Sequence, residues 1–178
     1  MFTEEMKKEG EILKLATRRR VYNTVQRCAG CHFRELQRRC KLPHGVVKYH
    51  LDYLSRHKII RQEKLGNNVR YFPRNLPSQE ERLLGLLRSP TSRQIIIFMC
   101  AKRKVGHKDI VNFVGLSPPT VSWHIKRLVD SGIVEPCGSG GKTGYSLRIE
   151  RGQVIKLLIT YRKSFLDSLV DRTVEMWG

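Results

Sequence analysis

Two eight-residue stretches of the sequence combine aliphatic residues with side chains that can form hydrogen bonds to another molecule. They read Val-Lys-Tyr-His-Leu-Asp-Tyr-Leu from Val47 and Val-Ser-Trp-His-Ile-Lys-Arg-Leu from Val121, an offset of 121 − 47 = 74 positions. Each places aliphatic residues at i, i+4 and i+7, which form one apolar stripe on a helix. The polar and aromatic side chains then share the opposite face, which is suited to contacts in the major groove of DNA.

Helices are expected around these stretches at residues 44–56 and 119–131, and their first turns are the part that reaches base edges. The candidate DNA contacts on them are His44, Val46, Lys48, Tyr49, Asp52, Pro119, Thr120, Ser122, Trp123, Lys126 and Arg127. The candidate phosphate contacts beside them are Arg38, Arg39, Lys64, Arg70, Lys108, Lys142 and Arg148. Phosphate contacts add affinity and salt dependence without sequence information. The alternative interpretation is a basic face that is only solvated.

The overall charge favours a polyanionic partner. The 178 residues include 34 Lys and Arg against 16 Asp and Glu, a formal charge of +18 with an isoelectric point near 10.2. Such a field attracts nucleic acid first, and a membrane surface or a ribosome next. No apolar run approaches the roughly 18 residues of a membrane-spanning helix, and the N-terminus lacks a secretory-signal pattern. These features predict a cytoplasmic, nucleoid-associated protein with no membrane partner, whose cysteines are thiols.

The offset of 74 positions extends through most of the chain. Without a gap it aligns Leu13 with Leu87, Thr17 with Thr91, Leu36 with Ile110, Leu42 with Leu116 and Ile59 with Ile133. A gapless register with the apolar positions in phase indicates a duplicated unit. We therefore expect one unit over residues 1–77, a second over 78–150 and a separate segment over 151–178.

Each unit is expected to contain three helices followed by a β-hairpin. In the first unit a lead-in helix at 3–15 precedes helices at 17–27, 32–40 and 44–56, and Thr17 is the expected N-cap. Strand-like runs at 59–65 and 69–72 flank a Gly-Asn-Asn turn, which predicts a basic hairpin, or wing.

The second unit follows the same order. Ser78 and Thr91 resemble the starts of capped helices, the leucine-rich helix after Ser78 is expected to be buried, and so is a helix at 95–100. Helices at 107–114 and 119–131 come next, and a longer, glycine-rich wing surrounds residues 138–144.

Residues 152–176 are predicted to form one long helix. Val154, Leu158, Tyr161, Phe165, Leu169 and Met176 share one face of it. Because this helix follows both units, we expect it to form a homodimer interface. The alternative is that it packs back over the units of its own chain.

Cysteine and histidine residues raise the separate question of metal binding. A zinc ion or a redox sensor could use Cys28, Cys31, Cys40 and His44. The second unit has Lys, Val, Val and Pro at the matching positions, so we expect the unit to fold without metal and assign no cofactor. His50 and His124 lie beside the apolar stripes and are expected to be packed and hydrogen-bonded. No credible catalytic set is evident.

The motifs resemble those of a known family. His32-Phe33-Arg34-Glu35-Leu36, Tyr49-His50-Leu51 with Leu54, and Arg70-Tyr71-Phe72-Pro73 resemble the first unit of archaeal tandem winged-helix transcriptional regulators. Residues 116–124, LSPPTVSWH, resemble the V-S-x-H recognition helix of the broad ArsR/MarR-like group. The resemblance covers roughly residues 15–149 and implies a DNA-binding regulator, often dimeric, with Thr120, Ser122 and Trp123 at base-reading positions. The chain lacks an E-x-C-x-C-D-type site, so metal sensing is not carried over.

Together these observations predict a mainly α protein with small β-wings. It would comprise two tandem winged helix-turn-helix units and a long C-terminal helix, and it would bind double-stranded DNA sequence-specifically to regulate transcription, without catalysis. Two alternatives remain, a protein–protein scaffold module of a transcription or trafficking complex and an RNA-binding factor. The high positive charge argues against the scaffold.

Overall fold

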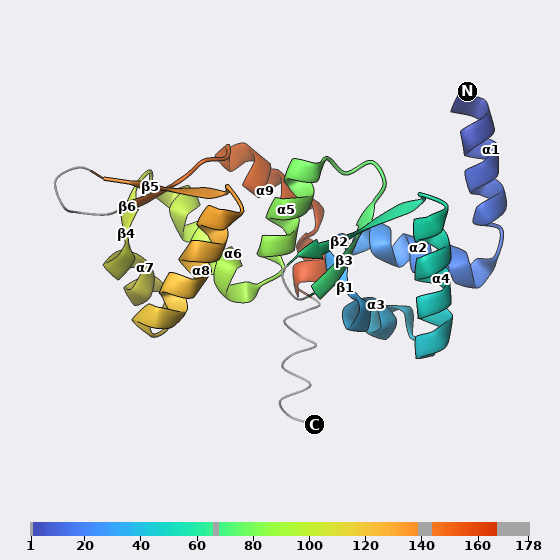
Figure 1. Ribbon diagram of the computed structural model, residues 1–178, viewed down its shortest axis with the longest axis horizontal. Helices are drawn as coiled ribbons and strands as arrows, with labels where there is room; N and C mark the ends of the chain where they lie inside the picture. The colour runs from blue at the N-terminus through green and yellow to red at the C-terminus, as the bar shows by residue number, and fades with distance from the viewer. Residues whose placement is uncertain (1, 66–67, 139–143, 167–178) are drawn as a thin grey trace. The chain divides into compact units, whose positions relative to one another are not determined.

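The computed structural model describes residues 2–65, 68–138 and 144–166, with the side chains of 2–6 left aside (Figure 1). The chain divides into two compact units. Unit 1 consists of Met1–Glu81 with the described part of Lys163–Gly178, and unit 2 consists of Arg82–Arg162. The described residues are mainly helical, with two small antiparallel sheets. None of the described helices is both long and apolar enough to span a bilayer.

Unit 1 consists of helices packed against a three-stranded sheet. Its elements are α1 (Phe2–Ile12), α2 (Ala16–Arg27), β1 (Cys31–His32), α3 (Phe33–Cys40), α4 (His44–Arg56), β2 (Ile60–Leu65) and β3 (Asn68–Pro73). The strand order is β1-β3-β2, and Cys31 and Gln62 both pair with Tyr71. The apolar stripe of α4 supplies Val47, Leu51 and Leu54 to the core, all fully buried.

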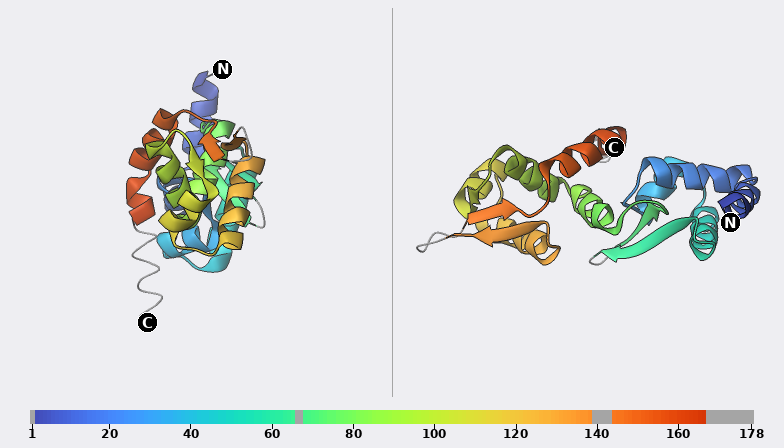
Figure 2. Two further views of the ribbon diagram at one scale, coloured as in Figure 1. Left: turned by 90° about the vertical axis from the view of Figure 1, so that its left-hand side faces the viewer. Right: turned by 90° about the horizontal axis from the view of Figure 1, so that it is seen from above.

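Unit 2 repeats this order. Its elements are α5 (Ser78–Leu87, which begins in unit 1), α6 (Pro90–Ala101), β4 (Val105–Gly106), α7 (His107–Val114), α8 (Pro118–Asp130), β5 (Val134–Cys137), β6 (Gly144–Leu147) and α9 (Arg151–Thr160). The strand order β4-β6-β5 matches that of the first sheet. The stripe of α8 buries Val121, Ile125 and Leu128. In each unit the hairpin lies beside the helix that precedes it, α4 or α8 (Figures 1 and 2).

The two units make equivalent turns with different residues. Lys41 and Lys58 have positive φ angles of 49° and 56°, and the residues 74 positions later, Gly115 and Gly132, have φ angles of 70° and 72°. These turns follow α3 and α4 in unit 1, and α7 and α8 in unit 2. Glycine adopts this conformation without steric cost, whereas a residue with a side chain is strained in it. Unit 1 therefore keeps two lysines at positions where unit 2 has the favoured residue.

Several helix starts differ from the prediction. Thr17 and Thr91 are not N-caps, because α2 begins at Ala16 after Leu15 and α6 begins at Pro90 after Ser89, with no side-chain cap in either helix. Proline is favoured in the first turn of a helix, since its missing N–H would have no partner there. The helix expected to be fully buried at 95–100 also exposes Ile97. The leucines of α5 are buried as predicted: Leu83, Leu84, Leu86 and Leu87.

The long C-terminal helix is not confirmed. Helix α9 ends at Thr160, a turn follows at Tyr161, and helical residues resume at 162–166. The predicted positions beyond 166 lie outside the described residues. Val154 and Phe165 are buried within the chain, as the alternative of packing back on the chain requires. Phe165 belongs to unit 1, where Arg39 Nη2 of α3 donates a hydrogen bond of 2.8 Å to the backbone oxygen of Ser164.

Candidate nucleic-acid interface

The outer face of α4 is polar and accessible. Lys48 is exposed, and Tyr49 is 58% exposed. Val47, two residues before Tyr49, lies on the opposite face and is fully buried. The ring of His44, in the first turn, lies 4.6 Å from the ring of Phe33 and is itself exposed. Arg38, at the end of the preceding helix, is also exposed. Val46 and Asp52 are half-buried, so they offer less surface to a partner.

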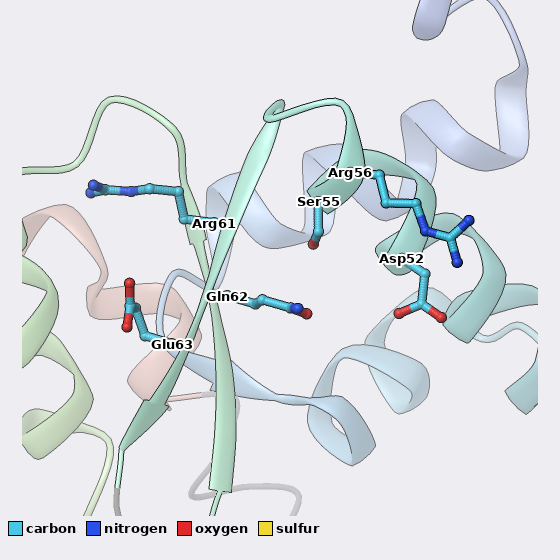
Figure 3. A pocket seen from close by; sticks show the side chains of 6 residues that line it. All are labelled: Asp52, Ser55, Arg56, Arg61, Gln62 and Glu63. Atoms are coloured by element: carbon cyan, nitrogen blue, oxygen red, sulfur yellow. The ribbon is translucent and has the colours of Figure 1, made fainter.

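A polar pocket of about 520 Å³ lies between α4 and the wing strand β2. Asp52, Ser55 and Arg56 line it from α4, and Gln62 points toward them from β2 (Figure 3). Arg61 and Glu63 point to the other side of the strand, as the two-residue repeat of a strand requires (Figure 3). There Arg61 forms an ion pair with Glu81 and donates a hydrogen bond to the backbone oxygen of Leu76. Sequence reasoning overlooked Gln62, because a single amide in a strand carries no pattern.

The first wing offers Lys64 but not Arg70. Lys64 is exposed on β2. Arg70 is only 7% exposed, and its Nη1 donates a hydrogen bond of 2.6 Å to the backbone oxygen of Gly30. The expectation that Arg70 contacts phosphate is therefore corrected: this guanidinium ties the sheet to the turn after α2. Arg39 is corrected in the same way, because it is half-buried and pairs with Glu35 at 3.0 Å.

The outer face of α8 carries the corresponding surface of unit 2. Trp123 is 58% exposed, and the guanidinium of Arg127 lies 5.7 Å from the centre of its ring. Ser122 Oγ lies 2.8 Å from His107 Nε2, and Thr120 Oγ1 lies 2.8 Å from Ser117 Oγ. These contacts hold two hydroxyls in place on an exposed face. His107 was not predicted as part of this surface, since nothing in its sequence position distinguishes it.

The remaining candidates of unit 2 are also accessible where the structure describes them. Lys108 of α7, Pro119 and Lys126 of α8, and Arg148 after β6 are exposed. Lys142 lies outside the described residues. The structure therefore brings most predicted residues of each unit onto the surface around α4 or α8, with Arg39 and Arg70 as the exceptions in unit 1.

The two equivalent histidines are packed inside their units. His124 is buried, and its Nδ1 lies 3.2 Å from Ser92 Oγ. His50 is buried as well, but its Nδ1 has no hydrogen-bond partner among the described residues. Burial lowers the pKa of both imidazoles, and the nearby Arg127 and Arg18 lower it further for His124 and His50 respectively. The lowered pKa favours the neutral form of both imidazoles. Each ring makes an edge-on contact with the aromatic residue before it, Tyr49 beside His50 and Trp123 beside His124.

The cysteines of unit 1 give no support to a zinc site. Cys28, Cys31 and Cys40 are buried thiols. Among the residues that the structure describes, no group of three or more His, Cys, Asp or Glu side chains is placed to hold a metal ion. Burial raises the pKa of the Cys40 thiol, which favours the protonated form that binds metal poorly.

Comparisons with known proteins agree with this geometry. A family model described as an N-terminal helix-turn-helix domain matches residues 15–84, and a winged helix-turn-helix DNA-binding model matches residues 88–135. The chain is also similar to an uncharacterized HTH-type transcriptional regulator of Methanocaldococcus jannaschii, with 29% identity over 137 residues. That match covers 77% of this chain and 34% of the relative, so the chain spans about a third of the relative's length.

Proposed function

We propose, from the chain's membership of the tandem winged helix-turn-helix transcriptional regulators, that it binds double-stranded DNA sequence-specifically through α4 and α8. The observation that carries this proposal is the pair Tyr49 and Trp123. They occupy equivalent positions, each is 58% exposed, and each lies on a helix whose opposite face is fully buried. Tyrosine and tryptophan are enriched at interfaces, so exposed aromatic side chains at equivalent positions of two helices favour a surface for a partner.

The proposed roles divide between the helices and the wings. Lys48 and Lys126 can donate hydrogen bonds to guanine, and Thr120 and Ser122 can contact base edges. Tyr49 and Trp123 can pack against thymine methyl groups or sugars. Lys64, Arg148 and Lys142 of the wings, with Arg38 and Lys108, then neutralise phosphates. The binding is non-catalytic and acts on transcription by occupying the DNA.

A homodimer through the C-terminal segment belongs to the same proposal. Ile155 and Ile159 of α9 are 51% and 62% exposed, and they are one helical turn apart. A second copy could cover this apolar strip. Sedimentation equilibrium would show a dimer that Ile155→Glu with Ile159→Glu converts to monomers. A monomeric wild-type protein at micromolar concentration would remove the dimer from the proposal.

The DNA proposal is tested by selecting bound duplexes from a random library and measuring their affinity by fluorescence anisotropy. Trp123→Ala should weaken binding to the selected duplex. Phe113→Ala is the matched control, because Phe113 is 52% exposed in the same unit but lies on α7. Failure to enrich any duplex sequence would contradict the proposed specificity. Stronger competition by structured RNA than by duplex DNA would instead favour an RNA-binding factor.

A further inference from the structure

A second pocket of unit 1, lined by basic side chains, lies at the end of α4 opposite His44. It has a volume of about 330 Å³. Its basic side chains come from α1, from the end of α4 and from the residue after β3: Lys8, Arg56, His57, Lys58 and Arg74. Ile12 and Ile59 add an apolar floor and are otherwise buried. Nothing in the DNA-binding proposal uses this pocket.

The backbone at Lys58 is the first sign that the pocket has a use. Its φ of 56° is the left-handed conformation, which disfavours any side chain. The equivalent turn of unit 2 uses Gly132 at a φ of 72°. Glycine is therefore compatible with this turn, yet unit 1 has Lys58 there. A strained residue that lines a cavity points to a functional side chain.

The charges of the pocket are specific to unit 1. The end of α4 reads Arg56-His57-Lys58, whereas the end of α8 reads Asp130-Ser131-Gly132. Among the described residues that line the pocket, Glu9 is the one carboxylate, and its Oε1 accepts a hydrogen bond of 3.2 Å from the hydroxyl of Tyr22. Among the side chains that the structure describes, Lys8, Arg56 and Lys58 form no ion pair with a carboxylate. These three side chains are thus available to an anionic ligand.

We propose that this pocket binds a small organic anion that carries a di- or triphosphate group. Several cationic side chains that line one pocket favour a ligand with more than one negative charge. The floor of Ile12 and Ile59 favours an organic portion, and the volume is at the small end of the range for ligand pockets. The C-terminal end of a helix disfavours an anion through its dipole. The attraction must therefore come from the side chains, and from Arg56 and Lys58 first.

Isothermal titration calorimetry with pyrophosphate and tripolyphosphate tests the site, on the full chain without DNA and at constant ionic strength. The wild-type protein should bind both anions with one site per chain. Lys58→Gly should weaken binding by about tenfold, the loss expected for one charge-assisted contact. The same variant should keep or raise the melting temperature, because glycine relieves the strained turn. Arg56→Gln should weaken anion binding in the same direction and tests the site independently.

Lys41→Gly is the matched control. Lys41 is also exposed and has a positive φ of 49°, but it lies in the turn before α4 and outside the pocket. It should leave pyrophosphate binding unchanged. The proposal is overturned if neither anion binds more tightly than sulfate, if Lys41→Gly weakens binding as much as Lys58→Gly, or if duplex DNA displaces pyrophosphate from the wild-type pocket. None of these results depends on whether the chain recognises a DNA sequence, so the two proposals fail separately.

Discussion

The equivalent residues on the two proposed recognition helices, α4 and α8, differ in chemistry. Lys48 aligns with Ser122, and Asp52 aligns with Lys126, while the aromatic position between them is Tyr49 in one helix and Trp123 in the other. An amine donates to guanine, and a carboxylate accepts from cytosine. The two helices are therefore expected to read different base sequences, and the site for one chain should not be a direct repeat.

Replacing Lys48 or Lys126 by alanine should weaken binding to the selected duplex by about 1–3 kcal/mol if each lysine pairs with guanine. The two variants should relax specificity at different positions of the site. Anisotropy titrations against duplexes with single base-pair changes measure both effects. Lys102→Ala, on an exposed lysine outside α8 that lies 5.0 Å from the Phe98 ring, is the control. Equal losses on every duplex would show that the lysines contact phosphates only.

The buried histidines predict a pH dependence of stability. Burial lowers the pKa of His50 and of His124 from the ordinary value of 6.5 in the folded chain. The unfolded chain then binds more protons than the folded chain as the pH falls below about 6.5, so acidification destabilises the fold. Urea unfolding at pH 7.5 and pH 5.5 should show this loss. It should be smaller in the variant with His50→Gln and His124→Gln, and an unchanged loss would contradict the assignment.

The glycines in the turns after α7 and α8 can be tested by substitution with alanine. Gly132→Ala and Gly115→Ala should each destabilise the protein by about 1 kcal/mol, because alanine is strained at a positive φ. Gly45→Ala serves as the control, since Gly45 lies inside α4 and an added Cβ there meets nothing within 4 Å. It should be neutral or stabilising. Denaturant unfolding measures all three, and a stable Gly132→Ala would show that the turn can rearrange.

The elements with a strong apolar period were the predictable ones. Helix α4 was predicted with its observed bounds, His44–Arg56, because its stripe is bordered by a proline turn and a hairpin. The two-residue strands β1 and β4 were missed, since two residues carry no alternation. The break at Tyr161 was missed for the opposite reason, as the apolar residues continue in phase beyond it. Periodicity reports which side chains are buried, but not whether the backbone between them is continuous.

The candidate site was predictable only in part. The exposed faces with Tyr49 and Trp123 follow from the stripes beneath them. Arg70 and Arg39 look like surface cations in the sequence, yet each donates to a backbone oxygen distant along the chain, that of Gly30 or Ser164, and Arg39 also pairs with Glu35 one turn earlier in α3. Such long-range partners have no local signal. Basic residues in a highly charged chain thus need a structure before they can be assigned to DNA.

The charge of the whole molecule predicts a steep salt response. A chain with a formal charge of +18 that neutralises several phosphates should lose affinity linearly in log–log coordinates as salt rises. Neutralising Lys64, Lys108 and Arg148 together should reduce the slope by about three, roughly one for each proposed phosphate contact removed. Anisotropy titrations from low to physiological salt measure the slope. A flat response in the wild-type protein would remove the electrostatic basis of the DNA proposal.

The hydrogen bond from Arg39 to Ser164 has a consequence for biosynthesis. The residues it joins are 125 positions apart, and both belong to unit 1. A ribosome must therefore translate all of unit 2 before the last strip of unit 1 emerges. The unit that starts first is completed last, and a chain truncated after Arg162 contains every residue of unit 2 but lacks the backbone acceptor of Arg39 in unit 1.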